Sequence, residues 1–328
     1  LKEQFFGRDL FAYEQPLTSD LYFFGREDEI KELYHRCEAG LNSGLFGLRR
    51  IGKTSVLFAL MRKLQADNGI AFYFKCYEPY FYEKRWWELL QLIAQELFSL
   101  PHLKGKAISA DYSEKEAGKS FQSDLTNAYK LLNTRIVLIF DEIEKIMYGL
   151  SSEEHWRDGK DYRAFWQTLR GIQQTNPELF SYVLAGVNPT VLESRTVGSY
   201  DNPIYSGLHT IYLPAFRYEQ VKEMVGTIGD YMGLTFDDRI SSYLADDYGG
   251  HPYLIRRACS QVHEKTKKYG RPYHIEKTAY DESKEEIDEA LVPNIREIIG
   301  VLEDYYPTEY LLLDSLATDD YEAFNSYV

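Results

Sequence analysis

A loop with two glycines, a lysine and a threonine carries the clearest chemistry in this sequence. Residues 47–54 read Gly-Leu-Arg-Arg-Ile-Gly-Lys-Thr and fit the pattern G-x-x-x-x-G-K-[ST]. The backbone N–H groups of such a loop surround a β-phosphate, which Gly47 and Gly52 permit because they lack a Cβ. Lys53 adds a positive charge at the β- and γ-phosphates, and the Thr54 hydroxyl is a candidate ligand for Mg²⁺. The other loop residues expected to contact a nucleotide are Arg50, Ile51 and Ser55.

The segments on either side of this loop decide between a phosphate site and a chance match in a glycine-rich turn. Leu45 and Phe46 precede the loop as the end of a buried strand would. Apolar residues then follow at helical spacing, at Val56, Leu57, Leu60, Met61 and Leu64. The loop therefore lies between a strand and a helix N-terminus, where free amides and the helix dipole favour an anion.

A second pair of candidate residues ends an apolar run. Residues 136–140 are Ile-Val-Leu-Ile-Phe, followed by Asp141 and Glu142. A strand buried on both faces reads as continuously apolar, and ligands bind at the carboxyl edge of parallel sheets. We expect Asp141 to hold the water shell of Mg²⁺ and Glu142 to orient and polarise an attacking water. The simpler alternative is a buried strand that ends in a charged turn.

Strands and helices alternate along the first two thirds of the chain, which predicts a parallel sheet with helices on both faces. Beyond Pro214 the pattern becomes helical. The expected strands are Ile70–Cys76, Phe180–Ala185 and Leu208–Leu213, besides those that flank the two motifs. The expected helices are Trp86–Leu100, Ser120–Asn133, 162–175, Tyr218–Tyr231, Asp237–Asp247, His251–Lys268, Ile295–Glu303 and Glu309–Ala317.

Two further segments, one before the loop and one after it, resemble motifs of the STAND branch of the AAA+ P-loop ATPases. Residues 23–30 are similar to the hhGR[ED]-x-E segment that lies against adenine in that family, with Gly25 and Arg26 at its fixed positions. Residues 249–254 are similar to its G-G-x-P motif, in which Pro252 would also lie against adenine. The resemblance implies that Arg256 or Arg257 reaches the phosphates as a second sensor. A glycine helix cap followed by a helix-starting proline is the alternative for residues 249–254.

The resemblance also implies a polar sensor after the fourth strand and an arginine that acts on a neighbouring subunit. Asn188 matches the sensor position, although an asparagine before Pro189 also favours a turn. The family segment S-P-L-[YF]-G-R corresponds to residues 202–207, which lack the arginine. Arg195 is the remaining candidate for a finger on the neighbour's γ-phosphate, and an exposed, solvated arginine is the alternative.

The implied fold is an α/β P-loop NTPase of the AAA+ type, with a five-stranded parallel sheet, a helical lid and the start of a C-terminal, possibly winged-helix, domain. The expected divisions are an N-terminal linker at 1–20, an ATPase core at 21–214, a lid at 215–270 and a truncated C-terminal domain at 271–328. The resemblance implies a slow ATP hydrolase that uses Mg²⁺ and assembles into a homo-oligomer when ATP is bound. This switch would control an effector outside the stretch, in bacteria often one that serves anti-phage defence.

Two other functions compete with the switch. One is a DNA-binding ATPase similar to origin-recognition proteins and helicase loaders, and the other is a nucleotide-binding scaffold without turnover. The chain has a net charge of −14, and residues 271–328 hold 15 Asp and Glu against 4 Lys and Arg. This acidity disfavours nucleic acid, whose phosphates attract basic residues. Glu142 argues against the scaffold, because a site without turnover needs no water-polarising acid.

Composition bounds the remaining classes. The 328 residues are 44% hydrophobic and 27% charged, as is ordinary for a soluble globular protein. The three cysteines lie far apart in the sequence, so neither a disulfide framework nor a zinc site is indicated, and the cytoplasm fits best. No apolar run is long enough to span a membrane. The chain begins with Leu1 and stops within a helical pattern, so we expect a fragment of a longer protein.

Overall fold

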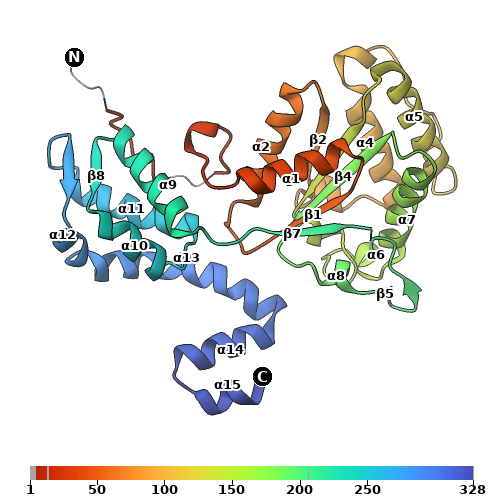
Figure 1. The fold of residues 1–328 in the computed structure, drawn as a ribbon. Helices are drawn as coiled ribbons and strands as arrows, with labels where there is room; N and C mark the ends of the chain where they lie inside the picture. The colour runs from red at the N-terminus through yellow and green to blue at the C-terminus, as the bar shows by residue number, and fades with distance from the viewer. Residues whose placement is uncertain (1–4, 13–14, 206, 328) are drawn as a thin grey trace. The chain divides into compact units, whose positions relative to one another are not determined.

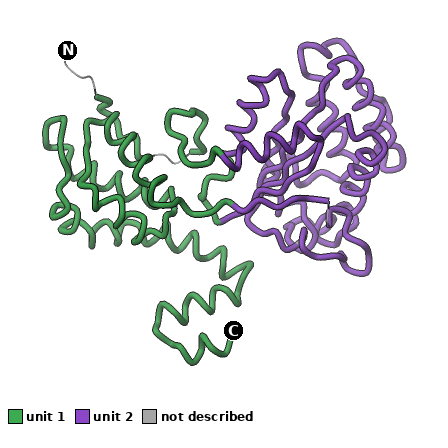
Figure 2. Tube along the Cα trace, in the orientation of Figure 1, with its two compact units in different colours: residues 1–27, 48–55, 213–328 green, residues 28–47, 56–212 purple. Residues whose placement is uncertain are grey.

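The computed structural model describes residues 5–12, 15–205 and 207–327. The chain folds into two compact units, which are considered separately (Figure 2). Unit 1 comprises residues 1–27, 48–55 and 213–328, and unit 2 comprises residues 28–47 and 56–212. The expected four-part division of the chain stays a prediction. Ser206 and residues 1–4 and 13–14, which fall in the predicted arginine segment and the predicted linker, lie outside the described residues.

Unit 2 is built on a five-stranded parallel sheet with the strand order β2-β3-β4-β1-β7 (Figure 1). The strands are β1 (Ser43–Phe46), β2 (Ile70–Lys75), β3 (Ile136–Asp141), β4 (Phe180–Gly186) and β7 (His209–Tyr212). Every residue of β1, β3 and β4 is buried, as the largely apolar sequences of β3 and β4 predict. The sheet confirms the expected fold class.

Helices cover both faces of this sheet (Figure 1). Alternate residues of β3 and β4, such as Leu138 and Leu184, belong to one core with the apolar sides of α4 (Trp86–Phe98), α5 (Ala117–Leu132) and α7 (Lys160–Thr175). Helices α1 (Glu27–Glu38) and α2 (Lys53–Ala66) lie along the other face. The short elements of this unit are α3 (Pro79–Tyr82), η2 (Pro101–Leu103), η3 (Ile143–Ile146), α6 (Glu154–Arg157), α8 (Thr190–Glu193), β5 (Thr196–Val197) and β6 (Tyr200–Asp201).

Unit 1 has a core of its own, made mainly by three helices. These are α9 (Tyr218–Tyr231), α10 (Asp238–Asp247) and α11 (Pro252–Thr266), joined by the strand pair β8 (Leu234–Phe236) and β9 (Tyr273–Ile275). The N-terminal residues Leu10 and Phe11 are buried in this core. The turn η1 (Asp20–Tyr22) precedes the expected adenine segment.

Four helices follow, α12 (Lys277–Asp281), α13 (Lys284–Tyr305), α14 (Pro307–Ala317) and α15 (Tyr321–Tyr327). Helix α13 packs Ile287, Leu291 and Ile298 into the core of unit 1. Only helices occur among the described residues 277–327, so the predicted winged helix stays a prediction. Within the described part of the chain, no helix is both long and apolar enough to cross a membrane.

Candidate functional site

The phosphate-binding loop follows β1 directly and leads into α2. Its backbone needs glycine at Gly52, where φ is 109°, and Arg50 also adopts a left-handed conformation with φ of 59°. Lys53 is the first residue of α2 and is buried, and its Nζ donates a hydrogen bond of 2.9 Å to the Leu48 carbonyl. The ammonium group is thus turned back onto the loop, where a phosphate group would meet it.

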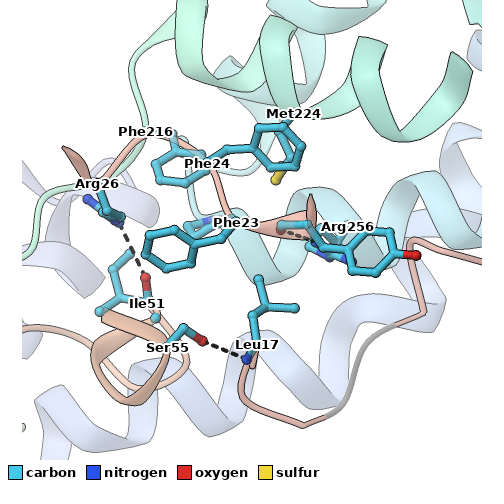
Figure 3. A pocket seen from close by; sticks show the side chains of 12 residues that line it. Leu17, Phe23, Phe24, Arg26, Ile51, Ser55, Phe216, Met224 and Arg256 are labelled. Carbon is cyan, nitrogen blue, oxygen red and sulfur yellow. Dashed lines mark hydrogen bonds between the residues drawn. The ribbon is translucent and has the colours of Figure 1, made fainter. Parts of the chain in front are cut away.

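An apolar hollow of about 50 Å³ lies beside this loop, entirely within unit 1. Figure 3 shows the rings of Phe23 and Phe24 turned toward it. The hollow is small compared with ligand pockets, which commonly enclose roughly 300–1,000 Å³, so a base would have to displace side chains that now fill the space. Its lining residues are Leu17, Tyr22, Phe23, Phe24, Arg26, Ile51, Gly52, Ser55, Phe216, Met224, Pro252 and Arg256.

Arg26 connects the expected adenine segment to the loop. Its side chain is 2% exposed, donates to the Ile51 carbonyl at 3.3 Å and lies over the Phe216 ring at 4.6 Å. The preceding residue, Gly25, has a φ of 63°, and its carbonyl accepts a hydrogen bond from Gln220 on α9. Three segments that are far apart in sequence therefore meet at the hollow.

The Arg256 side chain is buried and bound by the N-terminal segment. Its guanidinium donates to the carbonyls of Leu10 at 2.6 Å, Tyr22 at 3.3 Å and Phe11 at 3.4 Å. These bonds explain why the N-terminal chain is held against α11. Arg257, the other candidate for the second sensor, is half-buried on the same helix and does not line the hollow.

The two arginines of the loop are held by residues from the far end of the chain. Glu297 on α13 pairs with Arg49 at 2.9 Å and with Arg50 at 3.0 Å. The Arg50 guanidinium also lies over the Tyr253 ring at 4.6 Å. The buried His251 lies 3.1 Å from the Arg49 carbonyl through Nε2, and burial lowers its pKa to about 4. A neutral imidazole that donates through Nε2 accounts for this contact.

In unit 2, Asp141 and Glu142 lie where β3 ends. Strand pairing places Asp141 opposite Ala185, while Phe46 at the end of β1 is opposite Gly186, so Asp141 and the start of the loop lie at one edge of the sheet. Asp141 is buried and accepts a 2.7 Å hydrogen bond from the Tyr73 hydroxyl. The pKa of Tyr73 is raised, mainly because the phenol is buried and secondly because of the negative charge of Asp141.

Glu142 is exposed and occupies the left-handed region with φ of 53°. This backbone conformation costs a non-glycine residue about 1–2 kcal/mol. Such strain gathers at functional sites, where a particular side chain has to be presented. The structure therefore leaves Glu142 accessible where β3 ends.

Asn188 follows β4 and is buried at the same edge. Its side-chain oxygen accepts a 2.9 Å hydrogen bond from the Thr190 amide, which is the turn geometry expected of an asparagine before proline. Its own amide donates to Glu144 on η3 at 2.8 Å. The position is compatible with a sensor and with a turn former.

Arg195 lies just before β5 and is exposed. Its carbonyl accepts a hydrogen bond from the Asn202 amide, which ties it to the segment where the family arginine was expected. The structure thus leaves this guanidinium on the surface of unit 2. Its assignment as a finger stays a prediction.

The oxygen donors expected to serve Mg²⁺ are a hydroxyl and a carboxylate, Thr54 and Asp141, and such hard ligands suit this ion. Magnesium is commonly held by one or two carboxylates together with substrate phosphates and waters. No three His, Cys, Asp or Glu side chains of the described chain gather into a metal-binding group. The assignment of Thr54 and Asp141 to this ion stays a prediction.

Comparisons with known proteins bear on the fold. No family model and no curated protein sequence matches the chain. Among solved structures, a Walker-type ATPase of Pyrococcus abyssi superposes with a TM-score of 0.62 at 15% identity, over 94% of this chain and 84% of that one. The RuvB Holliday junction branch migration motor of Thermotoga maritima superposes with a TM-score of 0.50 at 17% identity, over 89% and 80%. This chain has an AAA+-type P-loop NTPase fold.

Three contacts of the site were not predicted from the sequence. They are the hydrogen bond from Tyr73 to Asp141, the hydrogen bond from the Asn188 amide to Glu144, and the ion pairs of Glu297 with the loop arginines. The signal for Glu144 was its place two residues after Glu142, in Asp-Glu-Ile-Glu. No pattern marks Tyr73 or Glu297, because each acts across a large separation in the sequence.

Proposed function

We propose that this chain binds ATP and hydrolyses it slowly as a switch. The observation that carries the proposal is the hollow beside the phosphate loop. Six of the residues expected to contact the nucleotide line this hollow: Arg26, Ile51, Gly52, Ser55, Pro252 and Arg256. Aromatic and aliphatic walls beside a phosphate loop suit a purine base, because they stack on its faces while the loop binds the phosphates.

Phosphate binding would change the bonds of Lys53. Its Nζ would exchange the Leu48 carbonyl for the β- and γ-phosphate oxygens, which form stronger, charge-assisted hydrogen bonds. The loop amides from Gly47 to Ser55 would surround the β-phosphate at the start of α2. Thr54 and Asp141 would hold the Mg²⁺ that arrives with the nucleotide, and the ion would neutralise charge on the phosphates.

Hydrolysis would use the sheet edge of unit 2. Glu142 would orient a water and accept its proton as the water oxygen bonds to the γ-phosphorus, while the bond from that phosphorus to the β–γ bridging oxygen breaks and ADP leaves. The Asn188 amide group would contact the γ-phosphate, and Arg195 of a neighbouring copy would stabilise the transition-state charge. Since the family arginine is absent at Gly207, we expect turnover below about 1 s⁻¹, the low end of typical enzyme rates.

The proposal of a switch rests on the order of the motifs. It includes STAND-like assembly when ATP binds and control of an effector in anti-phage defence. The hollow supports it in one respect. Because the hollow that Phe23 and Phe24 line is only about 50 Å³, nucleotide entry would have to move lining side chains, and the segment of these two residues leads to the N-terminal chain. A movement of this kind is what a ligand-driven change of state requires.

A DNA-binding helicase loader remains the competing function. RuvB, a branch migration motor, shares the fold, but this likeness extends to the fold alone. The four C-terminal helices lie in the stretch with 15 acids and 4 bases, which would repel nucleic acid. We therefore favour the switch.

Equilibrium titration with fluorescent ATP, followed by hydrolysis over a series of protein concentrations, tests the proposal. We expect saturable binding, slow turnover that rises with concentration, and a larger species with ATP than with ADP in a sizing experiment. Arg195→Ala should slow turnover only where subunits assemble. Rapid turnover by a monomer, unchanged in Arg195→Ala, would leave an ordinary ATPase in place of the switch.

A further inference from the structure

Glu144 joins two segments of the sheet edge that carry the proposed hydrolysis chemistry. It lies on η3, two residues after Glu142, and is 9% exposed. One oxygen of its carboxylate, Oε1, accepts hydrogen bonds from the backbone amides of Val187 and Asn188, the latter at 2.8 Å. Two consecutive amides converging on one charged oxygen make a charge-assisted arrangement, which is stronger and more directional than a neutral one.

The residue before these amides is adapted to the same carboxylate. Gly186 ends β4, and a Cβ at this position would overlap the Glu144 carboxylate. Any larger residue would therefore push the carboxylate away from the two amides. The close approach of the two segments thus depends on glycine at 186 and on an acceptor at 144.

We propose that Glu144 is a positioning residue that fixes Asn188 relative to Glu142. The inference rests on the proposed hydrolysis, in which Glu142 orients the water and Asn188 contacts the γ-phosphate. Glu142 and Glu144 are separated by a single residue, so a bond from Glu144 to the Asn188 amide sets the distance between the two functional groups. A displacement of about 1 Å in such an arrangement can slow a reaction about 100-fold.

The same contacts could serve only to cap a buried loop, and the two roles predict different kinetics. A capping role changes the stability of the fold and leaves the rate at which bound ATP is hydrolysed unaltered. A positioning role lowers the rate at which bound ATP is hydrolysed and leaves the affinity for ATP unaltered. It acts through Asn188. The second role therefore predicts strong non-additivity between the two residues, as expected of groups that work as one unit.

The experiment compares single-turnover hydrolysis and fluorescent-ATP affinity in Glu144→Ala, Glu144→Gln, Asn188→Ala and the double variant Glu144→Ala with Asn188→Ala. We expect Glu144→Ala to slow hydrolysis about 100-fold with unchanged affinity. Glu144→Gln keeps an acceptor oxygen and should lose less. The double variant should be no slower than the slower single variant. Glu154→Ala, a change at an exposed glutamate on α6, is the matched control and should match wild type.

Additive effects in the double variant, or a wild-type rate in folded Glu144→Ala, would overturn the inference. Gly186→Ala displaces the same carboxylate while residue 144 stays glutamate, and it should reproduce the loss if Glu144→Ala does not fold. Hydrogen exchange at the amides of Val187 and Asn188 is a readout independent of activity, and it should accelerate in Glu144→Ala. If wild type binds no ATP, the proposed function fails, while unchanged exchange in the variant rejects the positioning contact itself.

Discussion

The surroundings of the phosphate loop and the sheet edge of unit 2 are assembled in different ways. Around the loop, the decisive contacts join residues that are more than 240 positions apart in the chain, such as Arg256 with Leu10 and Arg50 with Glu297. At the sheet edge they join neighbouring strands and the turns that follow them, such as Tyr73 with Asp141 and Glu144 with Asn188. The comparison suggests that nucleotide binding depends on both ends of the chain, whereas hydrolysis depends on the sheet.

The largest expected effect separates the two regions. Glu142→Gln preserves the shape of the side chain but removes the base that accepts a proton from water, so turnover should fall about 10²- to 10⁴-fold. Binding of fluorescent ATP should stay at the wild-type affinity, since the loop is untouched. Single-turnover hydrolysis measures the loss, and a wild-type rate would assign the water to another residue.

The reciprocal change lies in the loop. Lys53→Ala removes a buried positive charge from the phosphates, and a charge-assisted hydrogen bond of up to about 3 kcal/mol corresponds to about 100-fold in ATP affinity. Lys63→Ala, at an exposed lysine near the other end of α2, is the matched control. Equal affinity in both variants would exclude the loop as the binding site.

Acid should loosen the loop region through His251. Its pKa of about 4 lies below the ordinary value of 6.5 because the ring is buried. Between pH 6.5 and 4, His251 is therefore protonated in the unfolded chain but not in the folded chain. The contribution of His251 to the free energy of unfolding should be fully present above pH 6.5 and fall as the pH drops toward 4. The expected loss is about 3 kcal/mol, from about 1.36 kcal/mol per unit of pKa shift. Chemical denaturation of wild type and His251→Gln across this range should show a shallower loss in the variant, and parallel curves would contradict it.

A smaller effect is expected where Tyr73 contacts Asp141. Tyr73→Phe removes the hydroxyl that orients the carboxylate, and loss of such a partner weakens metal binding about tenfold or more. The Mg²⁺ concentration needed for half-maximal ATP binding should rise accordingly, while binding at saturating Mg²⁺ recovers. An unchanged Mg²⁺ requirement would show that Tyr73 has no part in orienting Asp141.

The smallest effect should come from Glu297. Its pairs with Arg49 and Arg50 are partly exposed, and such pairs contribute about 1 kcal/mol or less, or up to about fivefold in affinity. Glu297→Gln should change the ratio of ATP to ADP affinity within this range, as competition titrations would show. Glu142→Gln in the same assay should leave the ratio of ATP to ADP affinity unaltered. A ratio that changes in Glu142→Gln and not in Glu297→Gln would contradict the assignment of binding to the loop region and of hydrolysis to the sheet edge.

The sequence predicted the parallel sheet and the alternation of strands and helices along the chain, because β3 and β4 are largely apolar and helix α7 keeps one apolar side. The order of the strands within the sheet comes from the structure alone. It also named half of the residues that line the hollow, six of twelve, since their motifs have fixed spacing. It missed Glu144 and Tyr73, because a sequence with 51 acidic residues and 28 tyrosines does not reveal which of them folding will bury. The sequence predicted a linker for the N-terminal segment, and only the structure shows that Arg256 binds its carbonyls.

The location of bound ATP tests the central claim most directly. Hydrogen exchange of the whole chain, measured with and without Mg²⁺ and ATP, reports which amides become protected. We predict protection in the loop at 48–55, in residues 23–26 of the adenine segment and at the start of α11 around Pro252. Saturable ATP binding without protection in the loop and the adenine segment would contradict the account, because the nucleotide would then lie elsewhere on the chain.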